Sequence, residues 1–166
     1  MKQETEIRFK INKEMSIKIY ETFLNWIYKE QKDIYYKGNF KGVLRTRESE
    51  NKKELCCKMD NNIGSWDEYE TEIDCDLDML NKIFKNIGLT EKVRINKTRL
   101  STKTFRKDKE IEINLDLIEG LGLFCEMEID GDYRNVIIEL AKELGIKEED
   151  ITTKGYVQLI KESRKK

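Results

Sequence analysis

Charged side chains alternate with apolar side chains in nearly every segment of this chain that reads as a β-strand. Near the start, Glu4, Glu6 and Arg8 alternate with Ile7 and Phe9, so a strand here would carry its charges on one face only. The charged face recurs at Arg45 and Arg47, Lys58, Glu68, Glu70 and Glu72, Lys97 and Arg99, Glu112 and Asp116, and Glu126 and Glu128. Exposure to water explains any single strand of this kind. The repetition along the whole chain needs another explanation.

A closed barrel would bring these charged faces together in one interior. If helices cover the apolar faces from outside, the charged faces must line a shared interior, and closure also removes the strand edges. Charges inside a protein are costly unless they pair or bind ligands. Basic side chains suit phosphate oxygens, and clustered carboxylates suit Mg²⁺, which bridges substrate phosphates. The pattern therefore predicts a site for a metal ion and a polyphosphate inside a barrel.

The remaining periodicity predicts an α+β fold with about eight antiparallel strands and helices packed outside. Two-residue alternation predicts strands over residues 4–11, 33–37, 43–47, 55–58, 68–73, 93–100, 105–117 and 124–130. Helical spacing predicts helices over residues 15–31, 77–87, 132–144 and 156–163. Asp132 is the expected N-cap of the third helix, and Gly88 and Gly145 are expected to end the second and third. No repeat or low-complexity linker divides the sequence, so residues 1–166 are expected to form a single domain.

Composition excludes several classes of function. The chain contains no His, so a base or metal ligand must be another residue type. Its four Cys lack metal-binding spacing, which argues against a structural zinc site. The 32 Lys and Arg residues nearly balance the 33 Asp and Glu residues, which argues against nucleic-acid binding through overall positive charge. No apolar leader or membrane-length run is present, so a soluble cytoplasmic protein, monomeric or homodimeric, is expected.

Eight short segments carry a family resemblance. They are ETEIRF at residues 4–9, QKDIYY at 31–36, LRTR at 44–47, LCCK at 55–58, EYETE at 68–72, NKTR at 96–99, LDLIEGLGLFCEME at 115–128 and GYVQLI at 155–160. In this order they resemble motifs of the CYTH family, the triphosphate tunnel enzymes that include class IV adenylyl cyclases and thiamine triphosphatases. The glycine-centred segment with its flanking acids is the most specific of them. The 31–36 and 115–128 segments are most similar to the cyclase-like members.

The resemblance implies metal ligands. Asp116, Glu126 and Glu128 would hold a Mg²⁺ or Mn²⁺ ion on the triphosphate. Glu4 and Glu6 would hold a second metal ion or position water. The alternative for Glu4 and Glu6 is an exposed edge strand.

The resemblance also implies a set of phosphate-binding cations. These are Arg8, Arg45, Arg47, Lys58, Lys97 and Arg99. Glu4, Glu6, Arg8 and Lys58 are the expected catalytic residues. Arg8 stands where the family has its first Lys, unless Lys10 takes that place. A surface pair is the alternative for Arg45 and Arg47.

Other charged and aromatic residues have less specific expected roles. Glu68, Glu70 and Glu72 would balance the basic residues, tune the second metal ion or form simple salt bridges. Asp33, Tyr35 and Tyr36 are expected to be packing and barrel-mouth residues rather than catalysts.

The expected function is an adenylyl cyclase of the class IV type, which converts ATP to cyclic AMP and pyrophosphate. One alternative on the same fold is a tripolyphosphatase or a thiamine or nucleoside triphosphatase. A non-catalytic module that binds polyphosphate or a nucleotide is an alternative of another class. The expected partner is thus a small triphosphate (ATP, tripolyphosphate or thiamine triphosphate), with neither nucleic acid nor membrane.

Overall fold

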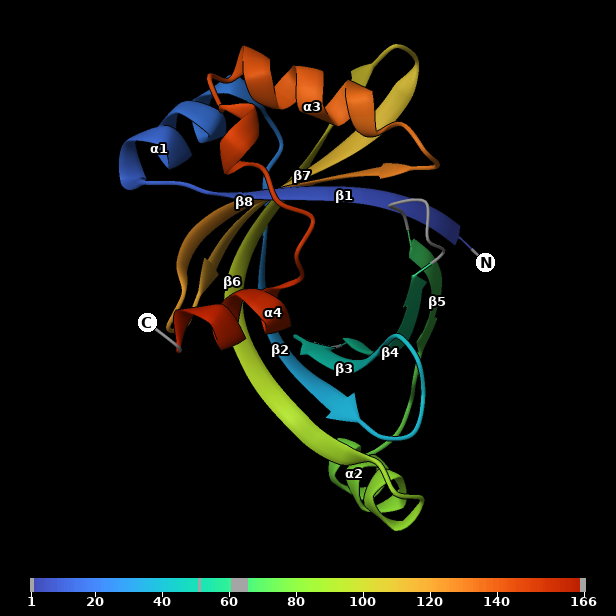
Figure 1. Ribbon diagram of the computed structural model, residues 1–166. Helices are drawn as coiled ribbons and strands as arrows, with labels where there is room; N and C mark the ends of the chain where they lie inside the picture. The colour runs from blue at the N-terminus through green and yellow to red at the C-terminus, as the bar shows by residue number, and fades with distance from the viewer. Residues whose placement is uncertain (1, 51, 61–65, 165–166) are drawn as a thin grey trace.

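Eight antiparallel strands close into a barrel in the order β1-β5-β4-β3-β2-β6-β7-β8, as a computed structural model of residues 2–50, 52–60 and 66–164 shows (Figure 1). The strands are β1 (Lys2–Lys10), β2 (Ile27–Lys37), β3 (Val43–Ser49), β4 (Lys52–Asp60), β5 (Trp66–Glu72), β6 (Thr90–Arg106), β7 (Lys109–Ile118) and β8 (Gly122–Asp130). The fold class predicted from the alternating charges is therefore confirmed. The helices are α1 (Lys13–Thr22), α2 (Leu77–Asn86), α3 (Arg134–Glu143) and α4 (Tyr156–Ser163), with a short 3₁₀ turn at Glu148–Asp150.

Two predictions about helices were wrong. The first helix does not reach residue 31, because Ile27 begins the strand β2 that pairs with β6 along its whole length. The indole N–H of Trp26 donates to the carbonyl of Phe23 and so satisfies the end of α1. The third helix begins at Arg134 after Tyr133, so Asp132 is not its N-cap.

The long hairpin of β6 and β7 also differs from the predicted segments. Residues 101–104, which lie between two predicted strands, continue β6 together with residues 105–106 of the second, and the turn is only Lys107 and Asp108. Both turn residues have positive φ, as two-residue hairpin turns of type I′ require. This register places Arg99 directly opposite Asp116.

The apolar faces of the strands are covered from outside. Helices α1 and α3 lie together over the outer face of β1, β7 and β8 (Figure 1). Ile7 and Phe9 of β1 pack there with Ile137 of α3 in the main apolar cluster. On the far side, the ring of Phe84 of α2 packs edge-on against Tyr36, so Tyr36 is an outer packing residue.

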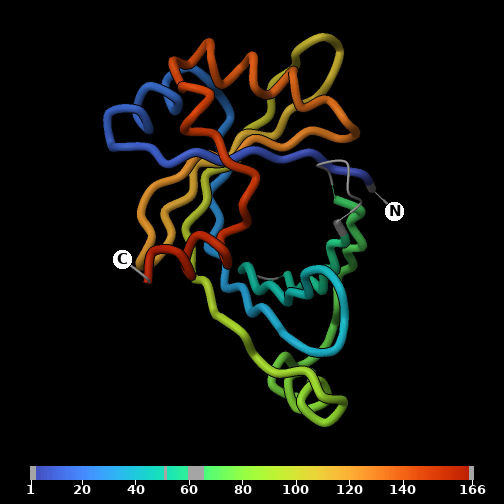
Figure 2. Tube along the Cα trace, viewed as in Figure 1, coloured from blue at the N-terminus to red at the C-terminus, as the bar shows by residue number. Residues whose placement is uncertain are grey.

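The C-terminal segment crosses one end of the barrel (Figure 2). Strands β1 and β5 share only three residue pairs in the described part of the chain, which leaves the second half of β1 without a neighbour on that side. Thr152 fills this gap by exchanging two backbone hydrogen bonds of 2.8 Å with Arg8. Helix α4 then packs Tyr156 and Ile160 against Phe124 of β8. None of the described helices has the length and apolar character needed to cross a membrane.

Candidate functional site

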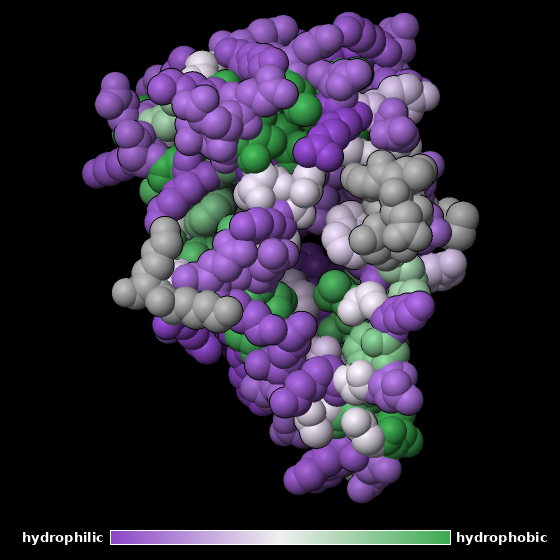
Figure 3. Space-filling view, viewed as in Figure 1, coloured by the Kyte–Doolittle hydropathy of each residue, from purple (hydrophilic) through white to green (hydrophobic). Residues whose placement is uncertain are grey.

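The barrel encloses a cavity of about 810 Å³ that is lined mostly by charged side chains. Figure 3 shows a hollow near the centre of this face with hydrophilic residues inside. Eleven of the predicted site residues line the cavity: Glu4, Glu6, Arg8, Arg45, Arg47, Lys58, Glu70, Lys97, Arg99, Glu126 and Glu128. Lys10, Glu72 and Asp116 lie outside its lining. Lys10 is exposed, so Arg8 is the β1 cation that faces the interior.

The charged faces are buried rather than solvated. Glu4 is only 3% exposed, which excludes the exposed edge strand considered for β1. Arg45 and Arg47 are also buried and do not form a surface pair. This placement follows from the barrel itself, because alternate residues of each strand must face its interior.

Three glutamates form a crowded group on the neighbouring strands β1 and β8. Carboxylate oxygens of Glu6, Glu126 and Glu128 lie within 4.8 Å of one another. Burial and the charge of Glu126 raise the pKa of Glu128 well above its usual value. Glu6 is itself paired with Arg8, whose Nη2 lies 2.7 Å from Glu6 Oε2. Such a set of hard oxygen donors fits a divalent cation of the Mg²⁺ or Mn²⁺ kind.

Glu126 joins this carboxylate group to two guanidinium groups. It is paired with Arg8, and Arg99 Nη2 lies 2.6 Å from its Oε1. Burial opposes the ionised form, but Arg8 and Arg99 outweigh it and hold the pKa of Glu126 well below its usual value. Glu126 is therefore the residue at which the acidic and basic parts of the cavity meet.

Both carboxylate oxygens of Asp116 accept hydrogen bonds from the protein. Arg99 donates to both of its carboxylate oxygens, at 2.7 and 2.6 Å, and the hydroxyl of Tyr156 donates to Oδ2 at 2.7 Å. The residue has no exposed surface. In this arrangement Asp116 orients Arg99, and it lies outside the cavity lining.

The other predicted phosphate-binding cations are also paired with acids. Arg47 forms a fork with Asp33 at 2.7 and 2.8 Å, and Arg45 Nη2 lies 3.1 Å from Glu70. Burial disfavours the ionised form of Asp33, but Arg47 lowers its pKa well below the usual range. Asp33 is thus a buried ion partner and not only the packing residue that the sequence suggested. Lys58 Nζ lies 2.9 Å from Glu4.

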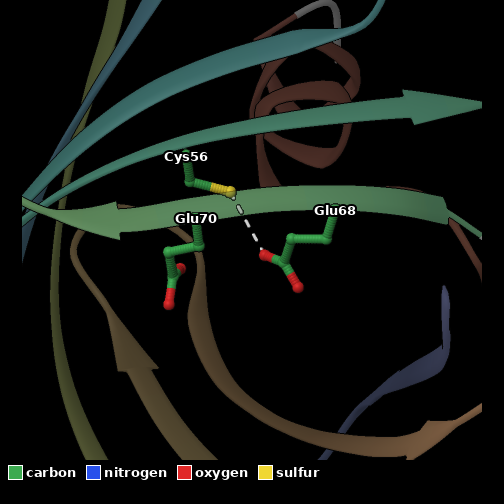
Figure 4. A group of neighbouring side chains, drawn as sticks. All are labelled: Cys56, Glu68 and Glu70. Carbon is green, nitrogen blue, oxygen red and sulfur yellow. Dashed lines mark hydrogen bonds between the residues drawn. The ribbon is translucent and has the colours of Figure 1, made fainter. Parts of the chain in front are cut away.

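A second acidic group lies on β4 and β5, where Cys56, Glu68 and Glu70 converge (Figure 4). The thiol of Cys56 donates to Glu68 Oε1 at 3.1 Å, and burial raises the pKa of this thiol to about 12. Lys58 and Arg45 already neutralise the two carboxylates. In this structure the group thus balances the charges of Lys58 and Arg45. Glu72 is exposed and lies outside the cavity lining, where it pairs with Lys52 of the lining.

Lys97 is a deeply buried cation of the cavity whose pKa is lowered. Its side chain is 2% exposed, and the nearest carboxylate oxygen in its ion pair, Asp116 Oδ2, is 3.7 Å away. Burial, with the nearby charge of Arg99, lowers the pKa of Lys97 to about 7. The ring of Tyr156 lies 5.2 Å from its Nζ. At pH values above about 7, Lys97 is therefore largely uncharged in the ligand-free protein.

This pKa predicts a proton linkage on ligand binding. A bound triphosphate should raise the pKa of Lys97, so binding above pH 7 should take up a proton and weaken as pH rises toward 9. Calorimetric titration with tripolyphosphate in two buffers of different ionisation enthalpy measures that proton. The Lys97→Arg variant keeps the charge without titrating, so it should lose the extra uptake. Equal uptake by the variant would contradict the prediction.

The structure adds three residues to the site. Tyr156 bonds Asp116 and stacks 4.9 Å from the guanidinium carbon of Arg8, although sequence comparison gave it no role. Glu112 lines the cavity directly opposite Glu128, and only the charge alternation of β7 pointed to it. Gln31 is buried in the lining among charged residues. The segment at residues 31–36 was part of the family resemblance, but the sequence offered no reason to expect a role for the neutral amide of Gln31.

Comparison with known proteins agrees with this architecture. The CYTH domain model matches residues 2–156. A Methanocaldococcus jannaschii protein that is provisionally named an adenylate cyclase is 29% identical over 175 aligned positions, which cover 94% of this chain and 97% of that protein.

Solved structures show the same barrel. A conserved hypothetical protein from Pyrococcus furiosus matches with a TM-score of 0.82 and 32% identity, covering 95% of this chain and 99% of that one. A Hippeastrum protein provisionally described as an adenylyl cyclase, with a dominant triphosphatase activity, matches with a TM-score of 0.65 over 98% of this chain and 96% of that one. At 13% identity, the second match shows the fold alone. The family match over almost the whole chain, together with this charged tunnel, shows that the protein belongs to the CYTH domain family.

Proposed function

We propose that this protein is a metal-dependent enzyme of the class IV adenylyl cyclase type, which converts ATP to cyclic AMP and pyrophosphate. The observation that carries the proposal is the meeting of two groups at Glu126. Three carboxylates on one side fit a divalent cation, and the guanidinium groups of Arg8 and Arg99 on the other fit phosphate oxygens. A metal-bound triphosphate presents both partners at once.

The proposed role of each residue follows from its charge, and the acidic residues would hold the metal ion. Glu126, Glu128 and Glu6 would hold the Mg²⁺ or Mn²⁺ ion, with Glu4 close by on the same strand face. The bound metal ion would neutralise charge on the phosphates. Asp116 would serve through Arg99, since its oxygens are occupied by Arg99 and Tyr156.

The cations would act by charge and not as bases. Arg8 stays protonated, because arginine does not titrate in proteins. Burial disfavours the charged form of Lys58, but Glu6 and Glu4 raise its pKa well above the usual value. Arg8 and Lys58, together with Arg45, Arg47, Lys97 and Arg99, would stabilise charge on the leaving phosphates. Removal of a proton from the attacking hydroxyl or water would fall to a carboxylate that does not hold the metal ion, such as Glu4.

A phosphohydrolase is the second candidate function. The Hippeastrum protein shows that a protein of this fold with a cyclase name can be mainly a triphosphatase. The same cavity charges support attack by water on the terminal phosphorus and attack by a ribose hydroxyl on the first, because both depend on positioning and electrostatics. Fold alone does not choose between them.

Product analysis tests the proposal. The protein is incubated with ATP, tripolyphosphate and thiamine triphosphate, each with Mg²⁺ or Mn²⁺, and products are separated by chromatography. Cyclic AMP and pyrophosphate from ATP are the expected result. Orthophosphate from any of the three would instead identify a phosphohydrolase. Metal-dependent binding without turnover would identify a binding module, and absence of both would refute a triphosphate site.

A further inference from the structure

Tyr156 brings the C-terminal segment into contact with the charged interior. It is the first residue of α4, is only 4% exposed and lines the cavity. Its hydroxyl donates to Asp116 Oδ2 of β7 at 2.7 Å, and its ring centre lies 4.9 Å from Cζ of Arg8 on β1 and 5.2 Å from Nζ of Lys97 on β6. Charged groups from three strands therefore surround one aromatic side chain that belongs to none of these strands.

The hydroxyl group limits how closely Lys97 can approach Asp116. Asp116 Oδ2 accepts a hydrogen bond of 2.6 Å from Arg99 Nη2 and one of 2.7 Å from Tyr156. A carboxylate oxygen has two lone-pair sites, so these two donors fill them. Lys97 Nζ stays 3.7 Å from the same oxygen, which is beyond hydrogen-bonding distance. Without the hydroxyl, one site opens, and the ammonium group of Lys97 is close enough to occupy it.

The ring of Tyr156 acts on Arg8 in a different way. An aromatic ring attracts a cation that lies over it. The guanidinium group of Arg8 lies over this ring, while its nitrogens pair with the carboxylates of Glu6 and Glu126. The ring thus fills the space on one side of the guanidinium group and limits its movement to the position that the two carboxylates set.

The backbone and the apolar contacts of the C-terminal segment determine where Tyr156 lies. Thr152, four residues earlier, exchanges two backbone hydrogen bonds of 2.8 Å with Arg8. The rings of Tyr156 and Phe124 pack edge-on in an apolar cluster, with their centres 5.7 Å apart. The segment is therefore anchored on both sides of the point at which its hydroxyl meets Asp116.

We propose that Tyr156 is a positioning residue of the tunnel. Its hydroxyl keeps Lys97 from closing on Asp116, so that the ammonium group of Lys97 is available to a phosphate group. Its ring holds the guanidinium group of Arg8 in place. The inference rests on the proposed triphosphate site and adds a residue that acts through the cations of that site. It follows that the set of cations is complete only when the C-terminal segment is docked.

The first test removes the hydroxyl alone. Dissociation constants of tripolyphosphate with Mn²⁺ are measured by calorimetry at pH 6, where Lys97 is largely protonated, for the wild type and Tyr156→Phe. The variant keeps the ring and should bind about fivefold more weakly. Binding equal to that of the wild type would overturn the role of the hydroxyl.

Tyr28→Phe is the matched control for this substitution. Tyr28 also donates to a carboxylate, that of Glu30 at 2.9 Å, but it is exposed and lies outside the cavity lining. The control should bind tripolyphosphate as the wild type does. A loss equal to that of Tyr156→Phe would show that the position of Tyr156 in the tunnel does not matter.

A double-mutant cycle with Lys97 distinguishes positioning from a structural role. Lys97→Met, or Lys97→Gln if the first fails to fold, should itself bind about tenfold more weakly. In that background, adding Tyr156→Phe should change the dissociation constant by less than about twofold, because no ammonium group remains to close on Asp116. If the hydroxyl only stabilised the fold, the same loss would recur in the Lys97 variant, and the positioning role would be wrong.

The ring is tested through Arg8 in the same way. Tyr156→Leu, or Tyr156→Met if the first fails to fold, removes the ring together with the hydroxyl and should bind about threefold more weakly than Tyr156→Phe. In the Arg8→Met background the two substitutions should give dissociation constants within about twofold of each other, because the guanidinium group is absent. A difference that persists in that background would overturn the role of the ring in placing Arg8.

The outcomes also separate this inference from the proposed function. If the wild type binds tripolyphosphate and the Tyr156 variants bind it equally well, the positioning role is wrong while the triphosphate site stands. If the wild type does not bind tripolyphosphate, the triphosphate site is refuted and the inference with it. Thermal unfolding of each variant shows whether its fold is intact.

Discussion

Replacing Glu126 with glutamine should lower triphosphate turnover by about a thousandfold. The substitution keeps the size of the side chain but removes the charge that Arg8 and Arg99 share and that completes the carboxylate group with Glu6 and Glu128. The variant should lose its response to Mn²⁺ more completely than its affinity for metal-free tripolyphosphate. The guanidinium groups of Arg8 and Arg99 lose their ion pair with Glu126 but remain in place to bind phosphate oxygens. Product formation over a metal titration measures the first effect, and calorimetry measures the second.

A matched control is present on helix α3. Glu139 is exposed and lies 2.6 Å from Lys107, so Glu139→Gln removes one charge from an ion pair outside the tunnel. This variant should keep wild-type turnover and metal dependence. If Glu126→Gln retained both as well, the carboxylate group would not be the metal site. Equal loss in the two variants would point to a general effect of charge.

Arg99→Met should destabilise the folded protein by about 3–5 kcal/mol. Asp116 has no exposed surface, and both of its oxygens accept from Arg99, so the substitution leaves a buried carboxylate bonded only to the Tyr156 hydroxyl and 3.7 Å from Lys97. Glu126 loses one of its two guanidinium partners at the same time. Urea unfolding of the variant and the wild type gives the difference in free energy.

Arg94→Met is the control for this effect. Arg94 lies on the same strand and forms the same kind of fork with Glu91, at 2.8 and 2.8 Å, but the two side chains are 63% and 43% exposed. Its loss should cost less than about 1 kcal/mol, because water replaces the partner of an exposed charge. Similar losses in the two variants would show that burial does not determine the cost.

Acid should reduce the difference caused by Arg99→Met. In the wild type, the charge of Arg99 helps to hold the pKa values of Asp116 and Glu126 below their usual values. Stability from such carboxylates is present above the unfolded pKa and is lost as pH falls through the folded pKa. In the variant the folded pKa values rise, so protonation relieves the unpaired charge at a higher pH. The unfolding free energies of the variant and the wild type should therefore converge as pH falls through the usual pKa range of carboxyl groups.

The barrel was predictable because its cause is local. The alternation of Glu4, Glu6 and Arg8 with Ile7 and Phe9 recurs on later strands, and only a closed sheet places all such charged faces inside. The extent of β2 was not predictable, because residues 27–31 carry helical spacing and become a strand only through pairing with β6. Long-range pairing competes with local preference and here determines the outcome.

The site contacts that could not be predicted from the sequence also depend on long-range pairing. The alternation of charged residues identified many of the charged strand residues that line the cavity, but not the lining contributed by α4 and the segment before it. The commitment of Asp116 to Arg99 depends on the register of β6 and β7, and the contact from Tyr156 depends on where α4 docks. Neither can be read from one strand. Gln31 is significant only because its amide oxygen is buried without a partner, which is a property of the folded interior.

The pairing of cations and acids inside the barrel has a consequence for selectivity. Each of the six phosphate-binding cations predicted from the sequence rests against a carboxylate, so an anion alone must break ion pairs to enter and leaves acids unpaired. A divalent cation alone meets the reverse problem. When the anion and the divalent cation enter together, each broken ion pair is replaced by a new one. The interior should therefore bind the metal complex of its ligand in preference to either ion alone. Free orthophosphate and free Mg²⁺, both abundant in cells, would then compete poorly for the tunnel.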